Sequence, residues 1–439
     1  MTPSPSSTSP APPQPRWRVL ILPGGTEIGL ELRQALAWNK DVELFSGGAA
    51  VSNHAPYVFA RHLVVPSVHE EGWIGALAKV VEENRITHIF PAHDDVTVAL
   101  AENAGQIPAK IVTSPLETCR LTRSKSATLR LFAGTVPVPR LYASPEDVAE
   151  FPVFVKPDRG QGSHNAARAD DVGRLRALLA EDTTRIIVEH LPGAEHTVDC
   201  FSDRDRGLLY ASGRQRRRVR NGIAVDSVLV QDPRFEDYAR RIASRLPLHG
   251  AWFYQVKADR DGELKLLEVA PRIGGTSGLS RANGVNLPLL SLYEADRLPT
   301  TVAAVPGVTG IDRALVSRFR HGFAYRTVYI DLDDTLIVRG QVNPELMKLL
   351  YQCLNRGVRI VLLTRHAGDL PTTLRRHRLD GLFDQVVHLK ADGSKADHVT
   401  DRPAIFIDDS FRERQDVALR TGVPALDPSM AEMLCDDRV

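Results

Sequence analysis

The sequence predicts a multidomain α/β protein with parallel sheets covered by helices, and three observations lead to this prediction. First, the chain has 439 residues, the length of about three domains. Second, apolar strands alternate with helical patterns over residues 17–91, an order typical of parallel sheets. Third, this alternation stops near residue 116, where Gly-rich and charged loops follow the strands, and it resumes after residue 326.

The first alternating region follows a Pro-, Ser- and Thr-rich segment, residues 1–16, which we expect to be a disordered tail. Strands are predicted at residues 17–22, 41–45, 62–65 and 86–91, and helices at residues 27–38 and 71–84. This order predicts a doubly wound, Rossmann-like domain over residues 17–115. The rest of the chain is predicted to contain an α+β domain (116–300), a linker rich in Pro, Val, Thr and Gly (301–325) and a second parallel-sheet domain (326–439).

Composition excludes several classes of function. With 55 Lys and Arg against 54 Asp and Glu, the formal net charge of +1 predicts no general affinity for nucleic acid or anionic membranes. The four cysteines lack C-x-x-C spacing, which argues against a zinc ribbon and favours a reducing compartment. No apolar stretch approaches the roughly 18 residues of a membrane span, and the N-terminus lacks the features of a signal peptide. We therefore expect a cytoplasmic protein, with a homodimer as one compatible assembly.

A first group of candidate residues has the chemistry of a phosphate site. Lys156 ends the apolar strand 151–155, where a lysine can reach the phosphates of a nucleotide. The loop that follows contains Gly160, Gly162 and Ser163, whose small side chains allow backbone amides to approach phosphate oxygens. Lys125 is a second candidate phosphate contact.

A candidate metal site lies farther along the chain. Gln255 and Glu268 belong to two predicted strands that are joined by the turn 259–262. Facing positions on paired strands can bring an amide oxygen and a carboxylate to one Mg²⁺, a hard ion that prefers oxygen ligands. Arg272 follows closely and is a candidate contact for a phosphate oxygen in catalysis.

With these residues in order, the region 17–299 resembles the ATP-grasp superfamily, in the branch of the large subunit of carbamoyl phosphate synthetase. The segments P-G-A-E-H-T-V-D at residues 192–199 and E-V-A-P-R at residues 268–272 carry the resemblance, together with Lys156, the Gly-rich loop and Val188-Glu189. The resemblance implies that ATP and Mg²⁺ are the cofactors, with Mn²⁺ as an alternative metal. It implies binding roles for Lys125, Lys156, Gly160, Gly162 and Ser163 at the phosphates, for Glu189, His190 and Leu191 at adenine, for Glu195 at the ribose, and for Gln255 and Glu268 at the metal.

The implied reaction activates a carboxylate as an acyl phosphate, which an amine or similar nucleophile displaces as ADP and phosphate leave. The family often has Asn two residues after the metal-binding glutamate, whereas this chain has Ala270. A ligand for a second Mg²⁺ is therefore missing or replaced by water. A kinase or carbamoyl-phosphate-type activity is the alternative enzyme reading of this region.

Two further motifs in this region have more than one interpretation. The basic run 214–220 is a solvated loop, a nucleic-acid patch or a clamp for an anionic substrate, and we favour the clamp for one or two of its arginines and solvation for the rest. The glycine-rich turn 24–29 lacks the G-x-G-x-x-G pattern. We expect it to be structural or part of an acceptor pocket, rather than an NAD site.

A second group of candidate residues follows the predicted strands of the C-terminal domain. Each polar group lies just past the carboxyl end of a strand, where sites in parallel sheets form. The group consists of Asp331, Asp333, Thr364, Lys395, Asp408 and Asp409, with Lys390 as the competing lysine. One aspartate of the first pair can attack phosphorus while the other transfers a proton. Thr364 and Lys395 can bind a phosphoryl group, and the late aspartates are oxygen ligands for Mg²⁺.

This set resembles the haloacid dehalogenase superfamily over residues 326–426. The resemblance implies that Asp331 is the nucleophile and Asp333 the general acid and base, and the candidate metal residues are Asp331, Asp333, Asp408 and Asp409. The gaps between the motifs are too short for a full cap domain, so we expect a minimal cap and an open site. The sequence thus predicts a bifunctional enzyme: a ligase for small-molecule carboxylate and amine substrates, and a phosphatase for a phosphorylated metabolite of the same pathway. The alternative from another class is a nucleotide-sensing regulatory protein with one silent site.

Overall fold

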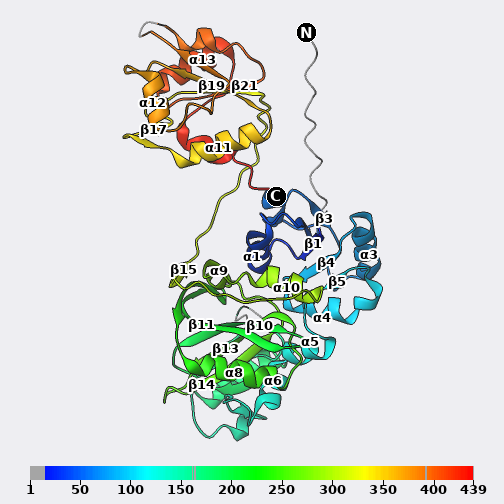
Figure 1. The fold of residues 1–439 in the computed structure, drawn as a ribbon. Coiled ribbons are helices and arrows are strands. Elements are labelled where there is room, and N and C mark those ends of the chain that lie inside the picture. Colours follow the sequence, from blue (N-terminus) through cyan, green and yellow to red (C-terminus); the bar gives the residue numbers. More distant parts are fainter. Residues whose placement is uncertain (1–14, 161, 163–164, 391–392, 439) are drawn as a thin grey trace. The chain divides into compact units, whose positions relative to one another are not determined.

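The computed structural model describes residues 15–160, 162, 165–390 and 393–438, and it divides into two compact units between Leu315 and Val316 (Figure 1). Each unit has its own sheets and its own hydrophobic core. No helix in these described ranges combines the length and the apolar composition that a membrane span requires.

The first unit begins with a five-stranded parallel sheet in the order β3-β2-β1-β4-β5. The strands are β1 (Trp17–Leu22), β2 (Val42–Gly48), β3 (His62–Val64), β4 (His88–Pro91) and β5 (Lys110–Ile111), and the helices are α1 (Glu27–Leu36), α2 (Ala55–Val58), α3 (Trp73–Glu83) and α4 (Asp94–Glu102). This parallel α/β architecture agrees with the prediction, although α2, α4 and β5 were not predicted. Strand β1 pairs with β2 and β4, so its carboxyl end lies beside the start of α4.

Strand β1 is buried on both faces, as expected for a central parallel strand. Val19 and Ile21 pack with Leu32 and Leu36 of α1, whereas Leu20 packs on the opposite face with residues of α3. Two layers of helices therefore hold the sheet, and the loops after β1 and β4 are left at its carboxyl edge. Thr26 begins α1 there by accepting a hydrogen bond from the N–H of Gly29 at 3.0 Å.

Two helices, α5 (Leu116–Arg123) and α6 (Lys125–Phe132), lead from this sheet into a small four-stranded sheet in the order β6-β9-β7-β8. Its elements are β6 (Leu141–Tyr142), β7 (Val153–Pro157), β8 (Ala167–Ala169), α7 (Val172–Glu181) and β9 (Arg185–Glu189). Strand β7 lies between β8 and β9 and pairs antiparallel with both. This arrangement places Lys156 and Glu189, which are on neighbouring strands, in the same small sheet.

The largest sheet of the unit has six antiparallel strands in the order β14-β13-β10-β11-β12-β15. Its elements are β10 (Glu195–Asp203), β11 (Gly207–Arg220), β12 (Ile223–Val230), α8 (Pro233–Ala243), β13 (Gly250–Ala258), β14 (Leu264–Ala270), α9 (Gly278–Ala282), α10 (Leu287–Ala295) and β15 (Gly310–Asp312). Phe235 and Ile242 of α8 pack with Trp252 of β13 on one face. On the other face, Phe201 shares a core with α10 and with β1 of the first sheet.

Strand β15 differs from the prediction, because it lies inside the segment that was predicted to be a linker. Gly310–Asp312 pairs antiparallel with β12. Upstream, Asn283 accepts hydrogen bonds from the N–H groups of Gly307 and Val308 at 3.1 and 3.0 Å. Residues up to Leu315 therefore belong to the first unit, and only the later part of residues 301–325 lies beyond the boundary. Backbone pairing of this kind needs no apolar pattern, so the composition of the segment did not reveal it.

The second unit contains a five-stranded parallel sheet in the order β20-β19-β16-β21-β22. Its elements are β16 (Thr327–Ile330), β17 (Ile337–Val338), β18 (Gln341–Val342), α11 (Pro344–Asn355), β19 (Arg359–Thr364), α12 (Leu370–Arg376), β20 (Gln385–His388), β21 (Ala404–Ile407), α13 (Phe411–Thr421), β22 (Ala425–Leu426) and α14 (Ala431–Leu434). Strand β16 lies between β19 and β21. The carboxyl ends of these three strands therefore meet at one edge of the sheet.

Between β16 and β19, the described elements are the two-stranded β17–β18 hairpin and the helix α11. Leu346, Leu349 and Leu350 of α11 are buried against the sheet, so this helix belongs to the core of the unit. The hairpin is a small element, and no separate domain lies between β16 and β19 among the described residues.

Candidate functional sites

The first candidate site is a cavity of about 190 Å³ in the first unit. It is bordered by the small sheet, by the start of α6 and by the facing strands of the six-stranded sheet. Its lining includes the predicted residues Lys125, Lys156, Gly160, Gly162, Glu189, His190, Leu191, Glu195, Gln255 and Glu268. The structure thus brings together residues that are up to 143 positions apart in the sequence. The predicted phosphate contact Ser163 lies outside the described residues.

Two lysines line this cavity. Lys156 follows the buried Val155 in β7, and Lys125 is the first residue of α6. Asp158 fixes the start of α6 by accepting hydrogen bonds from Ser124 Oγ and from the N–H of Ser126, both at 2.7 Å. Lys125 Nζ donates to the carbonyl oxygen of Gly160 at 2.7 Å, so the helix start and the Gly-rich loop are tied together.

The environment of Lys156 disfavours its charge. Burial, and secondly the nearby charge of Lys125, lower the pKa of Lys156 to about 8. The negative charges of Glu268 and Glu195 act in the opposite direction but do not compensate. A ligand with several negative charges would stabilise both ammonium groups, so this end of the cavity has the electrostatics of a polyphosphate site.

The Glu189 carboxylate, which also lines the cavity, already has hydrogen-bond partners within the protein. It accepts hydrogen bonds from Lys265 Nζ at 2.7 Å and from the N–H of Arg140 at 3.0 Å. The cavity wall also includes the apolar side chains of Phe154, Val188 and Leu267, of which the sequence analysis had singled out only Val188. An apolar slot beside a strand end suits a planar base whose polar edge pairs with the backbone.

The candidate metal residues face each other across two paired strands. Gln255 of β13 is directly opposite Glu268 of β14, and both line the cavity. Their amide and carboxylate oxygens are the donor types that Mg²⁺ prefers, so the pair fits a hard cation bound with a polyphosphate. Ala270 is paired with Phe253 two positions along the hairpin, and its methyl group is buried and offers no ligand.

Arg216 is one of two buried arginines of the basic run, together with Arg214. Its guanidinium pairs with Glu195 at 2.8 Å and donates to the carbonyl oxygen of Gly222 at 2.7 Å. The side chain is only 7% exposed, and its Nε has no hydrogen-bond partner among the described residues. By contrast, Arg217 and Arg218 form exposed ion pairs with Asp226 and Asp312.

A second cavity, of about 300 Å³, adjoins the first and shares part of its wall. The residues that line both cavities are Gly162, Arg216, Gly222, Gln255 and Glu268. The second cavity is also lined by Thr26, Glu27 and Ile28 after β1 and by Ala92, His93 and Asp94 after β4. Part of the glycine-rich turn therefore borders this cavity.

Arginines from two segments also border the second cavity. Arg272 binds Asp94 at 2.5 Å and lies 5.1 Å from the ring centre of Phe253. Burial alone would raise the pKa of Asp94, but the charge and hydrogen bond of Arg272 lower it overall. Arg214, from the basic run, is buried with Asp199 and donates to Thr276 Oγ1 at 2.8 Å.

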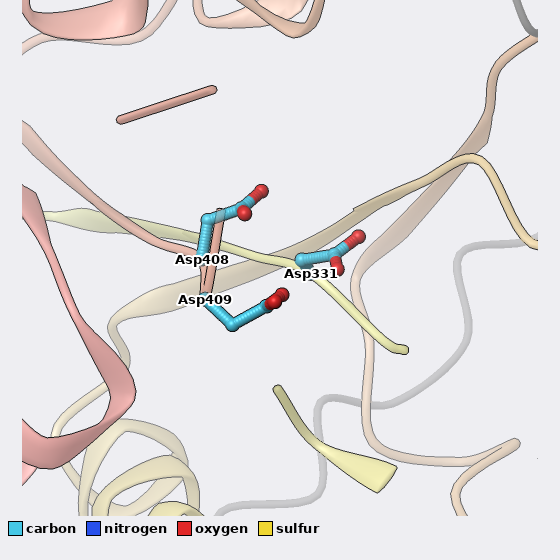
Figure 2. A group of neighbouring side chains, drawn as sticks. All are labelled: Asp331, Asp408 and Asp409. Atoms are coloured by element: carbon cyan, nitrogen blue, oxygen red, sulfur yellow. The ribbon is translucent and has the colours of Figure 1, made fainter. Parts of the chain in front are cut away.

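The second candidate site is a group of carboxylates at the carboxyl edge of the parallel sheet in the second unit. One oxygen each of Asp331, Asp408 and Asp409 lies within 4.8 Å of the others, and Figure 2 shows the three carboxyl groups on the same side of the strands. Asp331 follows β16, and the other two follow β21. Three carboxylates this close together are the donor set of a divalent cation, so these residues fit Mg²⁺.

Lys395 contacts two of these carboxylates. Its Nζ is 2.6 Å from an oxygen of Asp331 and 2.6 Å from an oxygen of Asp408. Burial, and to a smaller degree the charge of Asp408, raise the pKa of Asp331 to about 6, although Lys395 acts in the opposite direction. The lysine of the site is thus Lys395, whereas the competing candidate Lys390 is exposed.

Asp333 does not belong to the carboxylate group, which differs from its predicted place among the metal residues. Asp331 continues the buried strand, whereas Asp333 lies in a turn that Asp334 completes with a φ of 56°. The Asp333 side chain is 50% exposed, and His366 Nδ1 is 3.0 Å from both of its carboxyl oxygens.

The segment after β19 contributes more to the site than Thr364 alone. Thr364 is fully buried at the strand end. Arg365 donates from Nη2 to the carbonyl oxygen of Gly393 at 2.5 Å and binds Glu413 at 2.7 Å, so it holds the loop that precedes Lys395. Thr335 Oγ1 donates to Asp409 at 3.1 Å. The sequence analysis gave no role to Arg365 or Glu413, although each lies within a few positions of a motif residue.

One family model and many solved structures are similar to part of this chain. A family model described as "ATP-grasp in the biosynthetic pathway with Ter operon" matches residues 181–318. No curated protein matches the chain. Many solved structures are similar to it at low sequence identity, a level at which the likeness shows the fold alone.

Three of these structures illustrate the likeness. Biotin carboxylase from Campylobacter jejuni is 15% identical, with a TM-score of 0.53 over 65% of this chain and 72% of that chain. L-amino acid ligase from Bacillus licheniformis is 16% identical, with a TM-score of 0.52 over 64% and 74%. N5-carboxyaminoimidazole synthetase from Staphylococcus aureus, complexed with ADP, is 12% identical, with a TM-score of 0.56 over 67% and 81%. This likeness shows that the chain contains the fold shared by these ATP-grasp structures, and the family model matches residues 181–318.

Proposed function

We propose that the chain is a bifunctional enzyme with an ATP-dependent ligase in its first unit and a Mg²⁺-dependent phosphatase in its second. The observation that carries the ligase proposal is the shared wall of the two cavities. ATP occupies the smaller cavity, with its base at the apolar slot and its phosphates at Lys125 and Lys156. A carboxylate substrate occupies the larger cavity, on the other side of Arg216, Gln255 and Glu268.

In this arrangement the terminal phosphoryl group of ATP is transferred to an oxygen of the carboxylate substrate in the adjoining cavity. The products of this step are an acyl phosphate and ADP. The buried Arg216 and Arg272 stabilise negative charge on the phosphoryl oxygens during the transfer. An amine then attacks the acyl carbon and phosphate leaves. Gln255 and Glu268 would hold Mg²⁺, which supplies charge neutralisation at the phosphates when it is bound. With Ala270 in place of a ligand, one protein-bound metal ion is the expected number.

Trapping of the acyl phosphate tests the ligase proposal. Wild-type protein, Mg²⁺-ATP and pools of amino acids and other small carboxylates would be incubated with and without hydroxylamine. We expect ADP formation that depends on a particular carboxylate, with a hydroxamate as the trapped product. A phosphorylated metabolite without any amide or hydroxamate would support the kinase or carbamoyl-phosphate-type alternative. Tight ATP binding without turnover in any pool would support the nucleotide-sensing alternative.

The phosphatase proposal is supported by the resemblance to the haloacid dehalogenase superfamily and by the geometry of the aspartate group. A carboxyl oxygen of Asp331 attacks phosphorus and forms an aspartyl phosphate as the bond to the leaving group breaks. Asp333 gives a proton to the leaving group and later takes one from the water that releases phosphate. Lys395 and Thr364 hold the phosphoryl oxygens, and the three carboxylates would hold Mg²⁺.

We further propose that the phosphatase acts on a phosphorylated metabolite of the pathway that the ligase serves. Wild type and Asp331→Asn would each be incubated with Mg²⁺-ATP and a small-metabolite extract, and new masses would be recorded. We expect the variant to accumulate a phosphorylated compound that the wild type converts onward. Identical ligated products, without any accumulated phosphorylated compound, would show that the phosphatase serves a different substrate.

A further inference from the structure

The contact between Asp333 and His366 in the second unit is not part of the roles assigned above. His366 lies two residues beyond Thr364, and its Nδ1 is 3.0 Å from both oxygens of the Asp333 carboxylate. The imidazole is mostly buried, with 15% of its side chain exposed, whereas half of the Asp333 side chain is exposed. A rigid group thus touches a carboxylate that solvent would otherwise leave free to rotate.

His366 is itself held on several sides. Its Nε2 is 2.9 Å from Thr373 Oγ1 on α12, and its N–H donates to Thr364 Oγ1 at 3.2 Å. Its carbonyl oxygen is 2.7 Å from His388 Nε2 at the end of β20. At Gly368, an added Cβ would lie 3.1 Å from His366 Nε2, so the absence of a side chain there leaves room for the ring. These contacts fix both the backbone and the ring of His366.

We propose that His366 is a positioning residue that holds Asp333 in the orientation required for proton transfer to the leaving group. The proposal rests on the phosphatase activity proposed above for the second unit. When Asp333 is ionised, Nδ1 carries the proton that bridges to the carboxylate, and Nε2 accepts from the hydroxyl of Thr373. A carboxylate, an imidazole and a hydroxyl then form a chain that ends on α12, whose buried Leu374 anchors it in the core.

Both steps of the reaction depend on the direction of the Asp333 carboxyl group. In the first step, the bond from phosphorus to the leaving oxygen breaks as Asp331 attacks, and that oxygen receives the proton of Asp333. In the second step, the Asp333 carboxylate removes a proton from water as the water oxygen bonds to phosphorus and the aspartyl–phosphorus bond breaks. A misdirected carboxyl group lies outside the reach of proton transfer, so loss of the contact lowers the rate.

Leaving-group dependence separates this role from a purely structural one. A phenolate leaving group needs a proton in the transition state, whereas 2,4-dinitrophenolate is already a stable anion. The first turnover of phosphoenzyme formation would be measured with phenyl phosphate and with 2,4-dinitrophenyl phosphate in the full-length protein. The variants are His366→Ala, His366→Asn and Gly368→Ala, and His377→Ala, at the C-terminal end of α12, is the control.

We expect His366→Ala to slow the reaction of phenyl phosphate on the order of 10- to 100-fold and that of 2,4-dinitrophenyl phosphate by less than about threefold. The nearly unchanged second rate would show that the variant is folded. His366→Asn should recover part of the loss, because its amide nitrogen reaches the place of Nδ1, and Gly368→Ala should show a smaller selective loss. His377→Ala should react like wild type with both substrates.

Equal losses with the two substrates would overturn the positioning role, and so would an unchanged rate with phenyl phosphate. A wild-type protein that forms no phosphoenzyme with either ester would remove the proposed phosphatase function itself. The failure of that function is therefore distinguishable from the failure of the role of His366.

Discussion

The smaller cavity of the first unit has a lysine at its centre, whereas the group in the second unit has aspartates. In both, burial moves the pKa of the central group in the direction that favours its neutral form: the pKa of Lys156 falls to about 8, and that of Asp331 rises to about 6. A polyphosphate would reverse the first shift, and a divalent cation would reverse the second. Burial thus shifts the pKa of the central group in both sites, and a ligand of the opposite charge would reverse each shift.

The two sites also differ in their construction. The first is assembled from a helix start, a small sheet and a hairpin of a larger sheet, and its Lys125 donates to a backbone carbonyl oxygen. The second is assembled at one edge of one parallel sheet, and Lys395 already pairs with two of its carboxylates. We therefore expect changes in one site to leave the other unaffected, and substitutions in either unit can test this independence.

Replacement of the central carboxylate should have the largest effect. In Asp331→Asn, phosphatase activity should fall on the order of 10⁴-fold or more, because an amide cannot serve as the nucleophile. Hydrolysis of p-nitrophenyl phosphate would be followed in steady state, and ATP affinity would be measured by calorimetry in the same preparation. An unchanged hydrolysis rate would contradict the nucleophile assignment, and a large change in ATP affinity would contradict the independence of the sites.

In the first unit, replacement of Lys156 should have a smaller effect, which is on the binding of Mg²⁺-ATP. Lys156→Met should weaken binding of Mg²⁺-ATP about 10- to 100-fold, since charge-assisted hydrogen bonds contribute about 1.5–3 kcal/mol. Calorimetric dissociation constants would be compared with those of Lys79→Met, a replacement of an exposed lysine of α3. Equal affinities of the two variants would refute the phosphate-binding role of Lys156.

Replacement of Gly222, in the turn between β11 and β12, should have a moderate effect on nucleotide binding. A Cβ on Gly222 would lie 1.9 Å from the carbonyl carbon of Gly162, so Gly222→Ala must separate the turn from the Gly-rich loop. We expect ATP affinity to fall about three- to tenfold, an effect of about 1 kcal/mol. Gly262→Ala is the matched control, because Gly262 also has a positive φ, of 84°, but a Cβ added there would meet no described atom within 4 Å.

Both glycine variants should lose stability through backbone strain, since L-residues disfavour positive φ. Thermal unfolding would measure this shared loss. Only Gly222→Ala should also lose ATP affinity, and an equal loss of affinity in Gly262→Ala would exclude the proposed contact as its cause.

Proton uptake on nucleotide binding should be the smallest effect. With a pKa of about 8, about half of the Lys156 side chains are neutral at pH 8. Phosphates favour the charged form, so ATP binding should take up a fraction of a proton, with an uptake that grows from pH 7 to pH 9. Calorimetry in buffers of different ionisation enthalpy measures this uptake, and Lys156→Met should lack the contribution. Proton release in this range would contradict the assignment.

The same shift predicts how stability depends on pH without nucleotide. Between about pH 8 and 10.5 the unfolded chain binds more protons at Lys156 than the folded protein does. This group therefore makes the free energy of unfolding rise with pH through that window, and its destabilising effect is complete below pH 8.

Local sequence signals predicted much of both sites. Lys156 at a strand end, Gln255 facing Glu268 in a hairpin, and Asp331 and Asp408, each just after a strand, all follow from local spacing. Strand alternation and turn residues encode such positions within about ten residues of chain. Contacts between distant segments left no comparable signal: the pairing of Arg216 with Glu195 and of Glu189 with Lys265 needed the assembled sheets.

The sequence by itself determined the α/β class, the order of the polar groups at the strand ends and the residue types that each site offers. Only the tertiary structure decided which arginine of the basic run is buried between two cavities, and that β15 belongs to the first unit. It also separated Asp333 from the other aspartates and paired it with His366. The physical reason is that spacing sets the direction of a side chain along its own strand, whereas its partner and its burial depend on the packing of elements far away in the chain.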